Sequence, residues 1–150
     1  MTSSVIDDDQ QLSLKLFVVL TKAYKTIMDK AIKDMKNYGL SSSEFAVLEV
    51  LYTKGSIPLQ QIGEKILITS GSITYNIDKL EKKGLLKRVP AKEDRRVIYA
   101  ELTADGRQMF DRIFPLHAAR IHEFMSGVNA DQKRQMTEWL KQLGRTAEQR

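Results

Sequence analysis

Apolar residues between positions 10 and 36 recur every three or four residues, which is the period of one face of an α-helix. They are Leu12, Leu16, Val19, Leu20, Ala23, Ile27, Ala31 and Met35. A helix over this range would be about 39 Å long at 1.5 Å per residue, longer than a domain of this size needs for its own core. The pattern therefore predicts a long first helix that packs in part on a partner chain.

Two shorter helices are predicted next. Ser41 followed by Glu44 has the spacing of a capping box and predicts a second helix that stops near Gly55. Pro58 suits the first turn of a short third helix over 58–66, because its missing N–H has no helical partner at that position.

A fourth helix is predicted over 69–83, with Thr69 as its N-cap and Gly84 as its stop signal. The apolar positions of its buried side are Ile73, Ile77 and Leu80. The opposite face is polar and carries Ser70, Ser72, Thr74, Tyr75, Asn76 and Lys79. Such small or flat side chains can hydrogen-bond to base edges, and they are unusual on a helix that is merely solvated.

A two-stranded hairpin is expected after this helix. β-Branched and apolar residues fill 85–89 and 97–102 and flank a polar turn. Thr103 predicts the N-cap of a fifth helix, and Asn129 followed by Gln132 has capping-box spacing for a final one. The predicted fold is mainly α with a small β-hairpin.

Composition and charge narrow the function classes. The chain has 150 residues, the size of one domain, and 24 basic against 19 acidic residues give a net charge of +5. Eleven basic and seven acidic residues lie between 54 and 107, so most of the excess is predicted to lie there, above all from Lys79 to Arg96. The absence of cysteine excludes disulfides, cysteine-ligated zinc and a thiol nucleophile.

Three short helices followed by a hairpin form the winged variety of the helix-turn-helix, a DNA-binding fold. The helix over 69–83 would then place its first turns in the major groove. The hairpin tip places Arg95 and Arg96 where a guanidinium can enter the minor groove, with Asp94 able to steer one of them. The candidate DNA-binding residues are Thr69, Ser70, Gly71, Ser72, Thr74, Tyr75, Asn76, Lys79, Asp94, Arg95 and Arg96.

Several short motifs follow one another along the middle of the chain. They are the segments 43–51, 59–62 and 70–84, the Asp94–Arg96 turn and the Leu102–Gly106 motif. With these motifs and its flanking long helices, the chain resembles the MarR family of transcription regulators over nearly its whole length. The wing is the most specific part of the likeness, which places Arg96 at the family's minor-groove arginine and Asp94 at its orienting carboxylate.

The resemblance implies a homodimer joined through its N- and C-terminal helices. Each subunit would bind half of a pseudo-palindromic DNA operator, usually as a repressor that a small molecule releases. The chain would form one domain over 1–150, with a winged helix-turn-helix core at about 41–106 and dimerisation helices at about 10–38 and 107–148.

The segments 58–66 and 68–75 are similar to the MhqR-type branch of the family, which is associated with quinone stress. Because the chain lacks cysteine, a small aromatic or quinone-like effector would bind non-covalently, in an apolar pocket between the dimer helices and the DNA-binding core. The candidate pocket residues are Phe17, Tyr24, Tyr38, Phe45, Tyr52, Phe114 and His117. The alternative is that these are ordinary core and interface aromatics.

Three other classes fit the sequence less well. A metal-responsive regulator of the same fold would have to use His117 and His122, which lie about 140° apart around one helix and suit one ion poorly. A winged helix used for protein contacts would carry large apolar residues early in its recognition helix, where Tyr75 is the only sizeable one expected to be exposed. No catalytic or cofactor motif, signal peptide or membrane span is found, so a cytoplasmic protein that is not an enzyme is expected.

Overall fold

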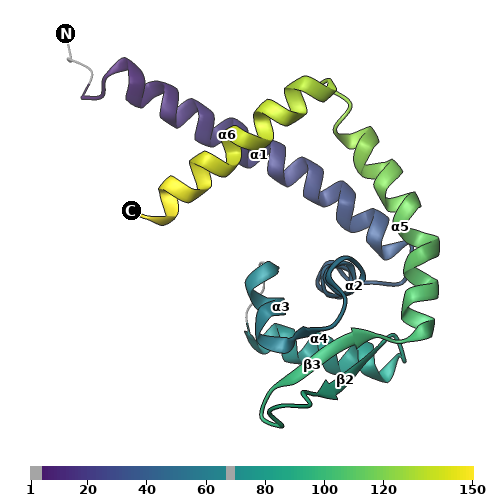
Figure 1. Ribbon diagram of the computed structural model, residues 1–150. Helices are drawn as coiled ribbons and strands as arrows, with labels where there is room; N and C mark the ends of the chain where they lie inside the picture. The colour runs from purple at the N-terminus through teal and green to yellow at the C-terminus, as the bar shows by residue number, and fades with distance from the viewer. Residues whose placement is uncertain (1–4, 67–69) are drawn as a thin grey trace.

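A computed structural model of the protein describes residues 5–66 and 70–150, with the backbone alone for residues 70 and 71. Its helices are α1 (Asp8–Lys36), α2 (Ser42–Lys54), α3 (Leu59–Lys65), α4 (Ser70–Lys82), α5 (Ala104–Phe124) and α6 (Ala130–Glu148), and its strands are β1 (Ile57–Pro58), β2 (Leu86–Pro90) and β3 (Ile98–Leu102). In Figure 1 α2, α3, α4 and the strands form one lobe, which the C-terminal end of α1 reaches, while the N-terminal half of α1 and α6 lie apart from it. The mainly helical fold predicted from the sequence is confirmed.

The wing belongs to a three-stranded antiparallel sheet in which β3 lies between β1 and β2. Ala100 pairs with Ile57 on one side and with Arg88 on the other. The predicted hairpin is confirmed as β2 and β3, and β1, which the sequence did not predict, adds a third strand. β1 is two residues long, too short to show the alternation that identifies a strand. Pro58 ends this strand and is also the residue before α3.

Capping boxes define the starts of three helices. The pairs are Asp7 with Gln10, Ser41 with Glu44, and Asn129 with Gln132. The second and third were predicted from their spacing. The first was not, and it explains why α1 begins at Asp8 rather than at Gln10, because the box satisfies backbone N–H groups that have no helical partner.

The core lies where α2 packs against α3, α4, α5 and the sheet. Its fully buried side chains include Phe45, Leu48, Leu51, Ile62, Ile77, Leu80, Leu86 and Phe110. The rings of Phe45 and Phe110 lie 5.1 Å apart and join α2 to α5. Because α4 contributes Ile77 and Leu80 to this core, the orientation of its opposite face is set by packing.

The base of the wing is fastened to the start of α5. The Thr103 hydroxyl donates to the carbonyl oxygen of Gly84 at 2.6 Å and accepts from the backbone N–H of Gly106 at 3.0 Å. A Cβ on Gly106 would lie 1.9 Å from the backbone oxygen of Leu85, so only glycine allows this approach. The Leu102–Gly106 motif thus has a structural role at the junction of wing and helix.

Helix α6 crosses the N-terminal half of α1, away from the winged core (Figure 1). All of α6 lies in the described part of the chain, and none of its residues is buried. The large apolar side chains that the two helices leave exposed include Leu12, Leu14, Leu16, Phe17, Val18, Val19, Met136, Trp139, Leu140 and Leu143. A single chain therefore leaves an extensive apolar surface uncovered.

Candidate nucleic-acid interface

Helix α4 presents a polar face to solvent. Its inward side is formed by Ile73, Ile77 and Leu80. The exposed residues of the opposite side include Ser72, Thr74 and Tyr75, and Tyr75 is 64% exposed. Of the predicted contacts, Thr69 lies outside the described part of the chain, as do the side chain of Ser70 and the surroundings of Gly71.

Asn76 does not belong to this exposed face. The residue is 5% exposed, and its Nδ2 donates to the carbonyl oxygen of Ser72 at 2.6 Å. The expectation that Asn76 lies with the exposed polar residues was wrong. It is four positions before the buried Leu80, so the two share a helix face, and its amide is satisfied within its own helix.

Lys79 and Lys83 both lie beside Glu44 of α2, which is 2% exposed. The Nζ–Oε distances to Glu44 are 3.6 Å from Lys79 and 2.7 Å from Lys83. Burial raises the pKa of Glu44, but hydrogen bonds from Lys83 and Ser41 and the charge of Lys83 outweigh burial and hold this pKa below its usual value of 4.5. Lys79 also lies 5.9 Å from the ring centroid of Tyr75, so its ammonium is partly engaged within the protein.

The turn between β2 and β3 carries Arg96. Its Nε and its backbone N–H both donate to Asp94 Oδ1, at 3.1 Å and 3.0 Å. The hydrogen bond from the Arg96 side chain, with that from its backbone, holds the pKa of Asp94 below its usual value of 3.8. The Arg96 side chain is nevertheless 91% exposed, and its neighbour Arg95 is exposed as well. The pair thus presents an oriented guanidinium to solvent.

The basic segment from Lys79 to Arg96 is less uniform than predicted. Several of its charges are paired with carboxylates: Lys79 and Lys83 with Glu44, Lys87 with Glu101, and Arg88 with Asp78 and Glu81. These charges are thus partly neutralised within the protein, and the DNA-facing strip from Lys79 to Arg96 stays a prediction. A count along the sequence could not find the pairs, because most of them join different elements.

Several of the residues predicted for the effector pocket lie at the junction of α2 and α5. The Tyr52 ring lies 5.3 Å from Phe114, and the Phe45 ring lies 4.4 Å from His117. A hydrogen bond from its hydroxyl to Asp111 raises the pKa of Tyr52. Phe45 itself is a core residue, 1% exposed. A cavity of about 420 Å³ opens here, lined by Glu49, Phe114, His117, Ala118, Ile121, His122, Met125 and Lys133.

Asp34 of α1 is buried next to this junction. Its Oδ2 lies 3.3 Å from His117 Nδ1, and its Oδ1 accepts from the Tyr38 hydroxyl at 3.5 Å. Burial raises the pKa of Tyr38, and the nearby charge of Asp34 adds to the effect. A buried polar contact thus joins α1 to α5. The sequence pattern did not indicate Asp34, because nothing local distinguishes it from a solvated carboxylate.

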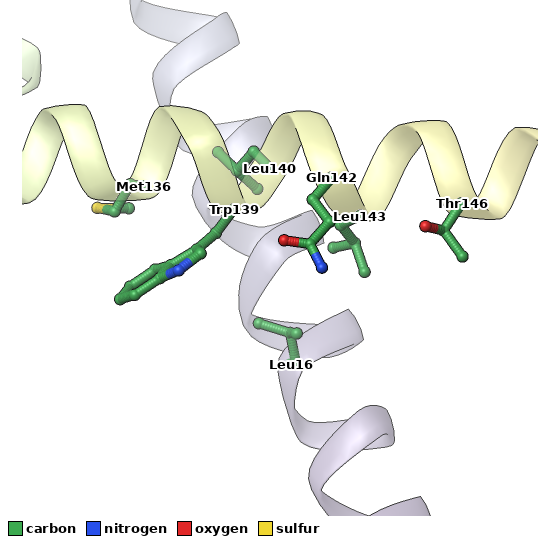
Figure 2. A pocket seen from close by; sticks show the side chains of 7 residues that line it. All are labelled: Leu16, Met136, Trp139, Leu140, Gln142, Leu143 and Thr146. Atoms are coloured by element: carbon green, nitrogen blue, oxygen red, sulfur yellow. The ribbon is translucent and has the colours of Figure 1, made fainter.

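Of the seven pocket candidates, Phe114 and His117 line this cavity, whereas Phe17, Tyr24, Tyr38, Phe45 and Tyr52 do not. Tyr24 is 62% exposed on α1, and Phe17 lines a cleft of about 460 Å³ between α1 and α6. A neighbouring cleft of about 570 Å³ is lined by Leu16 and Trp139 among others. Figure 2 shows these two side chains, from α1 and α6, facing the same open space.

The histidines do not form a metal site. In residues 5–66 and 70–150 no group of three or more His, Asp or Glu side chains could hold an ion. His122 lies 3.5 Å from Lys133 Nζ, whereas His117 contacts Asp34.

None of the described helices is long and apolar enough to cross a membrane.

A recognition helix with an exposed polar face, held on a helical core beside a wing that carries an exposed arginine, defines a winged helix DNA-binding protein. The family model described as MarR family matches residues 40–98. The chain is 51% identical over 137 residues to the HTH-type transcriptional regulator MhqR of Bacillus subtilis (strain 168), covering 91% of this chain and 94% of that protein. The chain therefore belongs to the MarR family of transcriptional regulators, which are DNA-binding proteins and not enzymes.

Solved structures agree on the fold. A mutant MarR from E. coli complexed with operator DNA aligns with a TM-score of 0.77 at 18% identity, covering 92% of this chain and 99% of that one. Bordetella bronchiseptica BpsR, whose DNA binding is regulated by 6-hydroxynicotinic acid, aligns with a TM-score of 0.77 at 21% identity, covering 86% and 92%. The winged helix architecture is thus shared at low sequence identity.

Proposed function

We propose that the protein is a homodimeric repressor that acts in the cytoplasm. Each subunit binds half of a pseudo-palindromic operator, with α4 in the major groove and Arg96 in the adjacent minor groove. A small aromatic or quinone-like effector, bound non-covalently, releases the DNA. The organisation is one domain, with the winged core at about 41–106 and dimerisation helices at about 10–38 and 107–148.

The proposed DNA contact rests on the exposure and the orientation of the Arg96 side chain. Its side chain is 91% exposed while Asp94 holds its Nε at 3.1 Å. A narrow minor groove has an enhanced negative potential that attracts such a guanidinium. The exposed hydroxyl and aromatic side chains of α4, which include Ser72, Thr74 and Tyr75, suit contacts to base edges in a major groove. The E. coli MarR structure with operator DNA supports this use of the fold.

The apolar surface of α1 supports the dimer. Phe17, Val18 and Val19 are consecutive and all exposed, so they point in directions about 100° apart around the helix. Helix α6 of the same chain lies across a cleft from Leu16 and Phe17, which nevertheless remain 52% and 65% exposed. A helix that is apolar all round is normally buried all round. A second copy of the chain would cover the remaining sides of α1 and the exposed face of α6.

The cavity between α2 and α5 supports effector binding. It combines the apolar side chains Phe114, Ile121 and Met125 with the polar groups His122 and Lys133, a composition typical of small-molecule sites. The 6-hydroxynicotinic acid that regulates DNA binding by BpsR is a small aromatic acid. The quinone-like class rests on the resemblance to the MhqR-type branch and on the identity to MhqR.

Selection of bound fragments from the protein's own genome, followed by fluorescence anisotropy on the selected duplex, tests the proposal. The logarithm of affinity should fall linearly with the logarithm of salt concentration, because phosphate contacts release counterions. Quinones or phenolic acids should then release the DNA. Enrichment of no sequence would favour a protein-contact module, and release by divalent metals alone would favour the metal-responsive alternative.

A variant pair tests the effector cavity. Phe114→Ala should weaken the effect of the effector by on the order of tenfold, since an aromatic wall is lost, without changing the affinity for operator in its absence. Leu116→Ala is the matched control: Leu116 lies on the same helix, is 54% exposed and does not line the cavity. Equal effector responses of the two variants would place the effector elsewhere.

A further inference from the structure

We infer that Arg88 is a positioning residue for operator binding. It fixes the wing against the recognition helix and so sets the separation between the major-groove and minor-groove contacts. The inference rests on the proposed function, in which α4 and Arg96 enter adjacent grooves.

The side chain of Arg88 bridges two carboxylates of α4. Its Nη2 lies 2.5 Å from Asp78 Oδ1, and its Nη1 lies 2.6 Å from Glu81 Oε1. The backbone N–H of Arg88 also donates to Glu81 Oε2 at 3.2 Å. Asp78 and Glu81 are three residues apart and share one face of the helix. The contact therefore holds both the side chain and the main chain of β2 against α4.

The position of Arg88 along β2 allows this contact to fix the direction of the wing relative to α4. Helix α4 contacts β2, and Leu80 of α4 and Leu86 at the start of β2 are both buried in the same core. Arg88 lies two residues further along β2, where the residue before it and the turn after it are largely solvated. β1 holds the central strand β3 at this level, with Ile57 opposite Ala100 and Pro58 opposite Tyr99, whereas the Arg88 bridge holds the outer strand β2 against α4. The bridge therefore relates the direction of the wing to the recognition helix itself.

Beyond Arg88 the polar contacts of the wing are internal. The backbone N–H of Ala91 donates to the carbonyl oxygen of Val97 at 2.9 Å, and that of Val97 donates to the carbonyl oxygen of Asp94 at 3.0 Å. These bonds shape the turn that carries Arg96. They do not relate the turn to α4, so its direction relative to that helix follows from β2, which Arg88 anchors, and from β3, which β1 holds.

Arginine suits this role better than lysine. A guanidinium is planar and offers several N–H donors in a fixed arrangement, so it can bind two carboxylates at once. The side chain of Arg88 is 29% exposed, which limits screening of the pairs by solvent. An ammonium at this position would retain the positive charge but would hold the two carboxylates less rigidly.

A purely electrostatic role makes a different prediction. The side chains of Asp78 and Glu81 are 53% and 41% exposed, and Arg88 could serve only to neutralise them near DNA phosphates. In that case the double variant Asp78→Asn/Glu81→Gln, which removes two negative charges, should bind operator more tightly. If Arg88 positions the wing, the same variant should bind operator less tightly, because the bridge is lost.

The test compares Arg88→Gln, Arg88→Lys and the double variant with the unaltered full-length protein. Dissociation constants are measured for the selected operator and for a random duplex over a range of salt concentrations. Arg88→Gln and the double variant should weaken operator binding by on the order of tenfold and random-duplex binding by less than about twofold, with Arg88→Lys in between. The salt slope of Arg88→Gln should fall by no more than about one, the change expected when only the Arg96 contact is lost, because Arg88 itself touches no phosphate.

Hydroxyl-radical footprinting supplies the positional readout. Protection of the minor groove at the wing sites should be lost in Arg88→Gln and retained in Arg88→Lys, while urea midpoints show that each variant is folded. Unchanged protection in Arg88→Gln, an equal loss on both duplexes or tighter binding of the double variant would overturn the inference. Absence of minor-groove protection in the unaltered protein would instead contradict the proposed binding mode itself.

Discussion

The Nζ of Lys83 donates to Oε2 of Glu44 at 2.7 Å, and this bond joins the start of α2 to the turn that follows α4. Glu44 is 2% exposed, and its other oxygen accepts the backbone N–H of Ser41 in the capping box of α2. One carboxylate therefore stabilises a helix start and also fixes the recognition helix on the core.

Glu44→Gln should destabilise the fold at neutral pH by about 1–2 kcal/mol, because the charge is lost while glutamine retains the capping box. The pKa of Glu44 is lowered in the folded protein, so its contribution is present above the ordinary value of 4.5 and is lost as the pH falls below it. Urea unfolding between pH 7 and pH 3 should show a shallower acid loss in the variant. Glu64→Gln, at an exposed position of α3, should match the unaltered protein, and equal profiles of all three would contradict this prediction.

Gly106→Ala should destabilise the protein by about 2–3 kcal/mol, because a Cβ there meets backbone rather than a flexible side chain. The obstructing atom is the oxygen of Leu85, 1.9 Å from the Cβ position. Gly127→Ala is the control, since nothing lies within 4 Å of its Cβ position, and its effect should stay within about 0.5 kcal/mol. Urea midpoints at equal protein concentration measure both effects. Comparable midpoints for the two variants would show that the junction of wing and helix can accommodate a Cβ at position 106.

Arg96→Ala should weaken operator binding by on the order of tenfold or more and reduce the salt slope by about one, because one cationic contact with the DNA is removed. Lys25→Ala removes the same charge from a side chain on α1 that is 78% exposed, and it should leave both quantities nearly unchanged. Anisotropy titrations over several salt concentrations measure both. If the two variants behave alike, Arg96 acts only through the net charge of the protein.

Trp139→Ser should weaken self-association, and operator binding should fall with it, because a large apolar side chain that is 63% exposed in one chain would be buried against the second copy. Sedimentation equilibrium across a range of protein concentrations measures the loss. Lys141→Ser changes a side chain two positions away, about 200° around α6, and should remain dimeric. A dimer of unchanged strength in Trp139→Ser would show that this face of α6 is not the dimer interface.

Local signals made much of the architecture predictable. The capping boxes at Ser41 and Asn129, the stop at Gly84 and the helical period of the apolar residues act within one or two turns of the chain, so their spacing alone indicates the helices they begin or end. The wing turn and the family resemblance likewise depend on short motifs. Both the mainly helical fold and membership of the MarR family are confirmed.

The partners of charged and polar groups were decided by the tertiary structure. The contacts of Arg88 with α4, of Lys83 with Glu44 and of Asp34 with His117 join separate elements, and a count of charges cannot locate them. Ion pairs and strand pairing depend on distances in space. The sequence by itself thus determined which helices form and where the recognition helix and wing lie along the chain, and packing determined which of their side chains remain free to meet DNA.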